Sequence, residues 1–222
     1  VRSPHLFFGG IYDWYDPFLA IDAVAAARRR REDLTLTFTY HPNAATTPQS
    51  VFVRARSEVA ARGYTFVRFE PWAPYEERGA FYDRFGLALL TFRSSLETDL
   101  AMRTRMFDCF WGDLPVITSP APGSDAIIES YGSGTVVRNF DAGAYADAIL
   151  GLLESEEDYA AALAGCRRWT LDHQWAHVMQ PLLEYCSNPK RTGASHTPDP
   201  APAIASREPL FARARRKLRS LF

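Results

Sequence analysis

The sequence predicts an α/β protein built on a doubly wound parallel sheet of about six strands, with helices on both faces. Short apolar runs of strand type alternate along the chain with longer stretches of helical periodicity. The segment Leu87–Phe92 (LALLTF) is almost wholly apolar, as expected of a parallel strand buried on both faces. The chain has 222 residues, 47% hydrophobic and 23% charged, which allows a sizeable core and excludes collagen, coiled coil and full-length disorder.

The predicted strands are short and end at turn residues or polar positions. The first ends at the pair Gly9-Gly10, and the second alternates strictly between apolar and polar positions (LTLTFTY). In chain order the strands are Leu6–Phe8, Leu34–Tyr40, Tyr64–Phe69, Leu87–Phe92, Pro115–Thr118 and Gly134–Val137.

Helical segments are predicted between these strands and after the last one. Asp16-Pro17 is a start signal for the first helix, and Gly63 is a stop signal for the second. The predicted helices are Pro17–Arg31, Val51–Arg62, Tyr75–Phe85, Thr98–Trp111, Asp125–Tyr131, Ala142–Leu153 and Glu156–Tyr185.

The composition changes near residue 188, so we expect a domain over 1–187 and a tail over 188–222. Five of the 15 prolines fall within 188–209, which predicts a disordered linker. From Lys190 to Phe222 the chain has eight Lys/Arg and two Asp/Glu, whereas residues 1–189 have 17 Lys/Arg and 24 Asp/Glu. The segment 210–222 reads as a short basic amphipathic helix, which predicts peripheral contact with an anionic membrane; a solvated extension is the alternative.

Cysteine usage predicts a reducing, cytoplasmic environment. Cys109, Cys166 and Cys186 are an odd number without CxxC spacing, so neither a disulfide framework nor a thiolate metal site is indicated. No apolar run approaches the ~20 residues that span a bilayer. Strand-like sequence follows Val1 almost at once without a signal-peptide pattern, so we expect the chain to begin in mid-protein.

Ligands of doubly wound sheets bind beyond the carboxyl ends of the strands, so the residues after each strand are the informative ones. Gly9 and Gly10 would let backbone N–H groups approach a phosphate, although an ordinary turn is the alternative. The GxGxxG fingerprint is absent, and the second strand ends in Tyr40-His41 where an acidic residue should hold a ribose. A nicotinamide-binding site is therefore disfavoured.

The densest polar cluster follows the fourth strand. On one continuous helix Arg105 and Asp108 would share a face, and Asp99 and Arg103 would share another. Two surface ion pairs are one interpretation. The position at the ligand-binding edge favours another, in which arginines bind a diphosphate and carboxylates bind sugar hydroxyls. The cluster comprises Glu97, Asp99, Arg103, Arg105 and Asp108.

Other chemistries lack support in the sequence. His173 and His177 are four apart, but HQWAH lacks the Glu of HExxH, so ordinary helix histidines are favoured and no metal site is expected. Trp169 and Trp175 are interpreted as packing residues. The run Arg28–Arg31 complements a helix C-terminus, so no nucleic-acid partner is expected. The sequence contains no GxSxG motif, so a serine hydrolase is not indicated.

Four segments in order resemble the donor-binding, C-terminal half of GT-B glycosyltransferases of the family 4-like group. They are GGIYDWYDP near the start, WAPYEER from Trp72, ETDLAMRTRMFDCFWGDLPVI from Glu97, and GSDAIIESYGSGTVV from Gly123. The resemblance spans roughly residues 6–185 and implies a Rossmann-like domain that holds a nucleotide-diphosphate sugar.

The resemblance also implies roles for individual residues. Asp108 stands seven residues before Pro115, where relatives carry the carboxylate that binds the ribose. Leu100 occupies the place of a first family carboxylate, so Glu97 or Asp99 would substitute for it. Arg103 and Arg105 take the diphosphate charge, and the loop from Trp72 to Tyr75 would meet the nucleobase, with Gly9 and Gly10 against the donor phosphates.

The resemblance implies a retaining hexosyltransferase that acts on a glycan or lipid-linked acceptor. No metal or other cofactor is expected, because arginines and helix N-termini would take the place of a divalent cation. Glu97, Arg103 and Arg105 are the predicted catalytic residues; Gly9, Gly10, Trp72, Tyr75, Asp99 and Asp108 are the predicted nucleotide-sugar-binding residues. An N-terminal acceptor-binding domain is the expected partner and is absent from these residues. The alternative is a non-catalytic nucleotide-binding or scaffold module of the same fold. We expect a cytoplasmic protein, peripheral at the inner face of the membrane through its tail.

Overall fold

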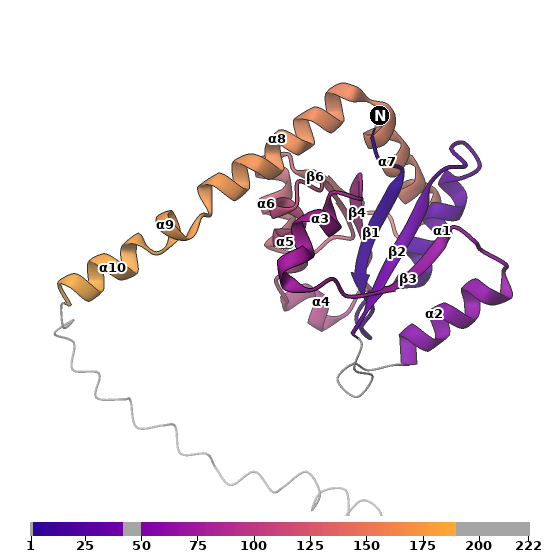
Figure 1. The fold of residues 1–222 in the computed structure, drawn as a ribbon, viewed down its shortest axis with the longest axis horizontal. Helices are drawn as coiled ribbons and strands as arrows, with labels where there is room; N and C mark the ends of the chain where they lie inside the picture. The colour runs from indigo at the N-terminus through magenta and orange to yellow at the C-terminus, as the bar shows by residue number, and fades with distance from the viewer. Residues whose placement is uncertain (1, 42–49, 190–222) are drawn as a thin grey trace, which may run out of the picture. The chain divides into compact units, whose positions relative to one another are not determined.

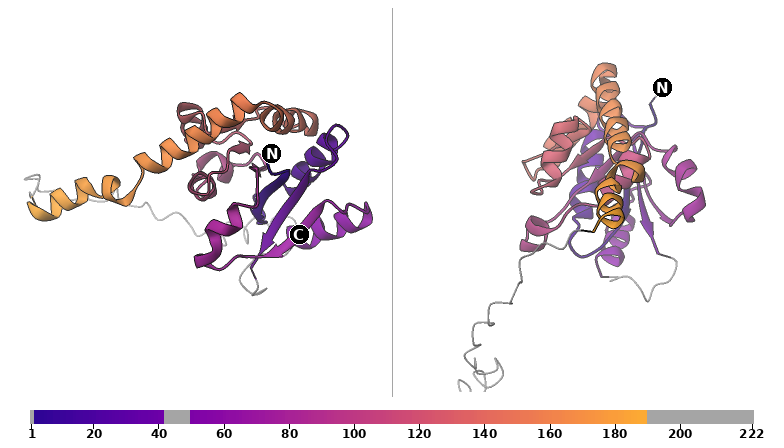
Figure 2. Two further views of the ribbon diagram at one scale, coloured as in Figure 1. Left: turned by 45° about the horizontal axis from the view of Figure 1, so that its top comes forward. Right: turned by 90° about the vertical axis from the view of Figure 1, so that its left-hand side faces the viewer.

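The computed structural model describes residues 2–41 and 50–189, in which six parallel strands form one sheet in the order β3-β2-β1-β4-β5-β6 (Figure 1). Helices lie on both sides of this sheet (Figure 2). The predicted fold class is confirmed. The strands are β1 (His5–Gly10), β2 (Thr35–Tyr40), β3 (Val67–Pro71), β4 (Leu87–Leu90), β5 (Val116–Thr118) and β6 (Gly134–Val136).

Both faces of the central strand β1 are buried, because successive side chains of a strand point in opposite directions. Phe7 packs on one face against Tyr82, with ring centroids 5.3 Å apart. Phe8 packs on the other face against Phe38 at 4.7 Å. This burial explains why the central strands are almost continuously apolar in the sequence.

The helices connect the strands and extend beyond the last one. Asp16 caps the first helix by accepting a hydrogen bond from the Leu19 N–H at 3.1 Å, and Pro17 occupies its first turn, as the start signal predicts. The described helices are α1 (Pro17–Ala27), α2 (Ser50–Ala61), α3 (Arg78–Tyr82), α4 (Leu96–Leu100), α5 (Arg105–Trp111), α6 (Ser124–Tyr131), α7 (Ala142–Glu154), α8 (Glu156–Asp172), α9 (Trp175–Val178) and α10 (Gln180–Ser187), with a 3-10 turn η2 (Tyr75–Glu77).

Helices α1 and α7 pack against each other although more than a hundred residues separate them. Ile21 and Val24 of α1 and Ile149 of α7 are completely or almost completely buried. Arg30, just beyond α1, also pairs with Asp147 of α7 at 3.3 Å. The first helix of the chain is therefore covered by one of the last.

The single helix predicted over Thr98–Trp111 is wrong, because α4 ends at Leu100 and α5 begins at Arg105. Ser95 caps α4 together with Thr98 in a capping box. The Arg103 side chain donates to the Thr98 carbonyl at 2.7 Å, so it satisfies one of the free carbonyls at the end of α4. The Arg103 backbone N–H donates to Ser124 Oγ at 3.1 Å, which ties the break to α6.

Two other predicted helices are also divided. The segment predicted as Tyr75–Phe85 consists of the turn η2 followed by the short helix α3. The segment predicted as Glu156–Tyr185 consists of α8, α9 and α10.

The chain falls into two compact units, Val1–Val178 and Met179–Phe222. The second is described only as far as residue 189, and its described helix is α10. The predicted linker and basic helix lie almost wholly outside the described residues, so the domain boundary at 187/188 stays a prediction. Within 2–41 and 50–189, no helix combines the length and apolar character that a membrane span requires.

Candidate functional site

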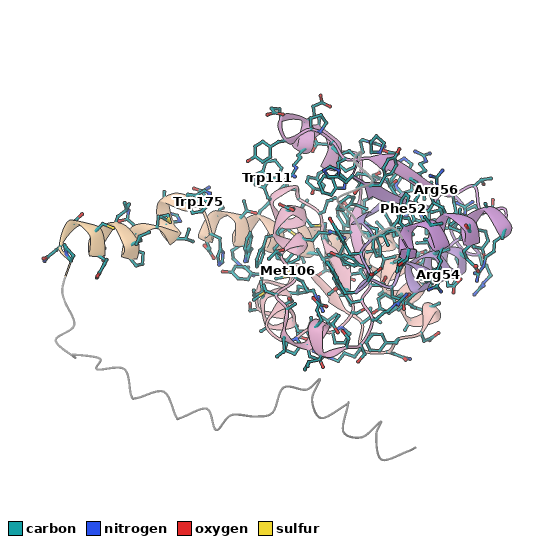
Figure 3. All side chains as sticks on the ribbon, turned by 90° about the horizontal axis from the view of Figure 1, so that it is seen from below. Phe52, Arg54, Arg56, Met106, Trp111 and Trp175 are labelled. Atoms are coloured by element: carbon teal, nitrogen blue, oxygen red, sulfur yellow. The ribbon has the colours of Figure 1, made fainter. Side chains whose placement is uncertain are left out.

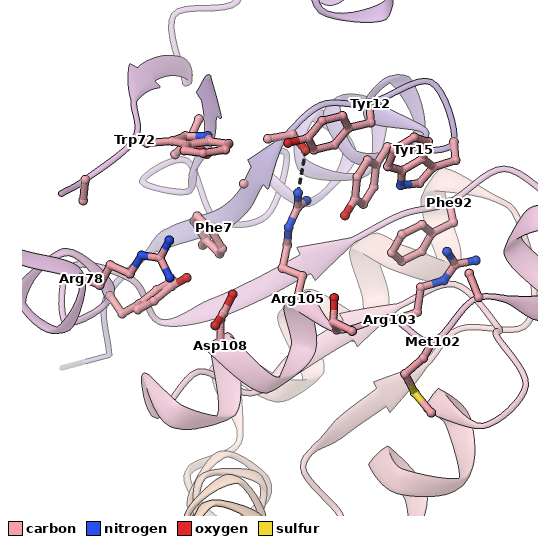
Figure 4. Close-up of a pocket in the computed structure, with 18 of the residues that line it drawn as sticks. Phe7, Tyr12, Tyr15, Trp72, Arg78, Phe92, Met102, Arg103, Arg105 and Asp108 are labelled. Atoms are coloured by element: carbon pink, nitrogen blue, oxygen red, sulfur yellow. Dashed lines mark hydrogen bonds between the residues drawn. The ribbon is translucent and has the colours of Figure 1, made fainter. Parts of the chain in front are cut away.

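A pocket of about 600 Å³ opens at the carboxyl ends of the central strands. Its walls include Gly9 and Gly10 of β1, Phe92 just after β4 and Trp72 just after β3 (Figure 4). The chain proceeds from β1 towards β3 on one side and from β4 towards β6 on the other, so β1 and β4 flank the topological switch point. Doubly wound sheets bind their ligands at this point.

Most of the predicted site residues meet in this pocket, although their roles stay predictions. Tyr75 is 77% exposed and Asp99 is exposed on α4, and neither lines the pocket. Those that do line it are Gly9, Gly10, Trp72, Glu97, Arg103, Arg105 and Asp108.

Arg105 is fixed at the end of β1. Its Nη1 and Nη2 donate to the carbonyl oxygens of Phe8 and Gly10, each at 2.9 Å. A guanidinium has five N–H donors, so donors remain for a ligand. The half-buried Arg105 thus places a positive charge at the end of β1. The first 27 residues contain no Lys or Arg except Arg2, so β1 and the loop after it supply no such charge themselves.

Gly9 leaves the space that this arginine occupies. Its φ is +89°, and β1 changes register against β2 between Phe7 and Gly9. A Cβ built on Gly9 would lie 3.0 Å from both Cζ and Nε of Arg105. Glycine is therefore required by the backbone conformation and by the approach of the guanidinium.

Arg103 is buried, with 6% of its surface exposed. Its Nη1 lies 3.8 Å from a carboxylate oxygen of Glu97, and this pairing replaces the predicted pairing with Asp99. Burial lowers the pKa of Arg103, whereas Glu97 raises it. Within the described part of the chain its buried Nε has no hydrogen-bond partner, which leaves one N–H donor uncompensated.

Two aromatic rings support the two guanidinium groups. Cζ of Arg105 lies 4.3 Å from the ring centroid of Tyr15, and Cζ of Arg103 lies 4.0 Å from that of Phe92. The two rings pack at 4.8 Å, and Tyr15 and Phe92 also form an isolated antiparallel bridge. Burial raises the pKa of Tyr15, and Arg105 and Arg103 partly oppose this shift. Cation–π contacts thus hold two like charges on one aromatic platform.

Two carboxylates complete the polar lining. Asp108 lies one turn after Arg105 on α5, is exposed and borders the pocket, as the spacing predicts. Glu97 of α4 has a half-exposed side chain. Tyr82 lies between charged groups: burial is the main cause that raises its pKa, Asp108 adds to the increase, and Arg78 opposes it.

Sequence reasoning missed several residues of the lining. Arg78 begins α3 and is a third arginine of the pocket. Tyr12 and Trp14 stack with ring centroids 4.9 Å apart, and the Trp72 ring meets His41 edge-on at 4.8 Å. Tyr12, Trp14 and Arg78 lie in the segments GGIYDWYDP and WAPYEER, which were the available signal.

The histidine and tryptophan interpretations have mixed outcomes. Helix α8 ends at Asp172 and His177 lies in α9, so the two histidines do not share one helix. Across 2–41 and 50–189 no three His, Cys, Asp or Glu side chains cluster in a way that could hold a metal ion. Trp169 does pack, stacking on Phe107 at 4.7 Å, whereas Trp175 is 78% exposed, so its interpretation as a packing residue is wrong (Figure 3).

No protein-family model matches the sequence, and no curated protein matches it. Solved structures do match. The pneumococcal O-GlcNAc transferase GtfA, solved with UDP and GlcNAc, has a TM-score of 0.66 at 14% identity, over 84% of this chain and 36% of its own. Anabaena Alr3699/HepE, solved with UDP and glucose, has a TM-score of 0.68 at 14% identity, over 84% of this chain and 48% of its own.

A third similar structure is an isolated domain. The C-terminal domain of the glycosyl transferase group 1 family protein LpcC from Francisella tularensis has a TM-score of 0.59 at 14% identity. The match covers 76% of this chain and 84% of that domain, whereas this chain spans less than half the length of the two transferases above. The chain therefore has the fold of the C-terminal, Rossmann-like half of a GT-B glycosyltransferase.

Proposed function

We propose that this chain is the donor-binding part of a glycosyltransferase and that its pocket takes a nucleotide-diphosphate sugar. The observation that carries the proposal is the convergence of three arginines and two carboxylates at the switch point of the sheet. The fold likeness to transferases solved with UDP supports it.

The order of groups along the pocket matches the order of parts in such a donor. Trp72 and Arg78 lie at one end, Arg105 and Asp108 in the middle, and Arg103 at the other end (Figure 4). In the proposed pose the base lies at the Trp72 end, the ribose hydroxyls meet Asp108, and the diphosphate meets Arg105. The sugar then lies near Arg103 and Glu97.

This pose gives the arginines a role in transfer. The bond between the sugar and the diphosphate breaks, and negative charge develops on the departing phosphate. Arg105 is held in place before the ligand arrives, so its free N–H groups stabilise that charge without reorganisation. Arg103 adds a second, buried positive charge that lines the same pocket. We propose that these groups supply the positive charge, with no requirement for a metal ion.

The finer features of the reaction belong to the same proposal. Transfer of a hexosyl group with retention, to a glycan or lipid-linked acceptor, follows the family resemblance. Because the chain spans 36% and 48% of the two transferases, we propose that an N-terminal acceptor-binding domain completes the active site. A cytoplasmic location beside the inner membrane face is consistent with such an acceptor.

Calorimetric titration of the chain with UDP, GDP and ADP tests the proposal. We expect saturable binding of at least one nucleotide with one site per chain. Circular dichroism of the same sample establishes that the chain is folded. A folded chain that takes up none of the three at millimolar concentration would contradict the proposed function.

A further inference from the structure

We infer that Arg78 selects the nucleobase of the donor. It favours bases with an oxygen at the pyrimidine C4 or purine C6 position (uracil, thymine, guanine) over bases with an amino group at that position (cytosine, adenine). This inference rests on the proposed function and assigns a specificity-determining role to a residue that the polar cluster after β4 does not include.

The position of Arg78 places it at the nucleoside end of the proposed pose. Trp72 follows β3, which is two strands away from β1, and neighbouring strands are ~4.8 Å apart. The end of β3 is therefore about 10 Å from the strand end that holds Arg105, a separation comparable to that between a diphosphate and its base. Arg78 and Trp72 lie at the same end of the pocket (Figure 4).

The donors of Arg78 are uncommitted. Among the described residues its guanidinium makes no ion pair within 4.0 Å and no side-chain hydrogen bond. The group is half-buried, and its Cζ lies 5.2 Å from the ring centroid of Tyr75, a contact that supports it. Arg105 differs, because two of its N–H groups are already bound to backbone carbonyls.

The chemistry of the guanidinium then decides which base edge it accepts. Arginine has five N–H donors and no acceptor. Uracil, like thymine, presents O4 and guanine presents O6, and both accept hydrogen bonds. Cytosine and adenine present an amino group at the corresponding position, which places donor against donor. The indole N–H of Trp72, at the same end of the pocket, is likewise a donor only.

Two matched nucleotide pairs test the inference: UDP against CDP, and GDP against ADP. Calorimetry on the full 222-residue chain should give an affinity ratio of roughly 5- to 150-fold in favour of the oxo member in at least one pair. Arg78→Met keeps much of the aliphatic stem and removes the donors, so it should bring that ratio towards one. A wild-type ratio near one in both pairs, or an unchanged ratio in Arg78→Met, would overturn the inference.

Two controls separate base recognition from other effects. Arg84→Met removes an arginine that stacks on Phe81 at 5.1 Å, much as Arg78 stacks on Tyr75, but does not line the pocket; the ratio should persist. Comparing UMP with UDP distinguishes a phosphate contact: if Arg78→Met weakens UDP but not UMP, Arg78 binds phosphate and the inference fails. If a folded chain binds none of the nucleotides, the proposed function itself fails; binding without base preference refutes the inference alone.

Discussion

Substitution of Gly9 by alanine should weaken nucleotide-diphosphate binding by displacing Arg105. The backbone of residue 9 has φ +89°, a left-handed conformation that is strained for any residue with a Cβ. The added methyl group would also lie 3.0 Å from the guanidinium carbon of Arg105. Arg105 would have to shift by a few tenths of an ångström, which would distort its hydrogen bonds to the Phe8 and Gly10 carbonyl oxygens. The positive charge at the end of β1 would then be displaced within the pocket.

The magnitude follows from two contributions. Backbone strain at positive φ costs about 1–2 kcal/mol for a residue with a Cβ. Distortion of the two hydrogen bonds of Arg105 adds at most about 1–3 kcal/mol to the loss in unfolding free energy. Loss of a charge-assisted hydrogen bond to the ligand, about 1.5–3 kcal/mol, corresponds to a roughly 10- to 150-fold lower affinity for the diphosphate.

Gly63→Ala is the matched control, because Gly63 has φ +65° and an added Cβ would meet no atom within 4 Å. It should show the backbone strain alone and bind nucleotide normally. Urea unfolding measures both stabilities, and calorimetry measures both affinities. In an Arg105→Ala background, Gly9→Ala should cause no further loss of affinity. Wild-type affinity in Gly9→Ala, or a loss of stability no larger than that of Gly63→Ala, would refute the reasoning.

Two more predictions concern Asp108 and Tyr145. Asp108→Asn should weaken UDP binding by about 1–3 kcal/mol and remove the preference for UDP over 2′-deoxy-UDP, because the carboxylate is expected to bind the ribose hydroxyls; calorimetry that finds the preference intact would exclude that contact. The Tyr145 hydroxyl bonds to Ser119 Oγ at 2.7 Å, and burial raises its pKa from 10.0 to about 12. The folded state keeps this proton after the unfolded chain has lost it, so its stabilisation is complete below pH 10 and is lost as the pH rises towards 12, by at most about 1.4 kcal/mol per pH unit. Tyr145→Phe should therefore lose less stability than wild type in urea unfolding over that range, and identical curves would contradict this account.

The sequence predicts the sheet well, because parallel strands buried on both faces leave a strong apolar pattern. It predicts the helix breaks poorly. No glycine or proline lies between Leu100 and Arg105 to mark the break. The break is instead accompanied by two hydrogen bonds of Arg103, one from its side chain to the Thr98 carbonyl and one from its backbone N–H to Ser124, which lies 21 residues further along the chain. Tertiary contacts therefore override local propensity at this point.

The candidate site was predictable where a motif or strand end marked it, and not where geometry decided it. Gly9 and Asp108 have such signals. Arg78 falls within a segment predicted as one helix, whose pattern does not reveal which side chains face a pocket. The family resemblance left Glu97 and Asp99 as alternatives for the carboxylate missing at Leu100, and of the two only Glu97 lines the pocket.

The packing of α1 against α7 has a consequence for how the chain is made. A ribosome synthesises residues 17–27 long before residues 142–154. The surface of α1 that packs against α7 therefore stays exposed until α7 has been synthesised. Ile21 and Val24 are buried in the folded protein, but they lack this partner until α7 has emerged. Chains that await long-range contacts fold slowly and expose aggregation-prone surface meanwhile. A nascent chain that stalls before Ala142 should therefore be a stronger chaperone substrate than one that has passed Glu154.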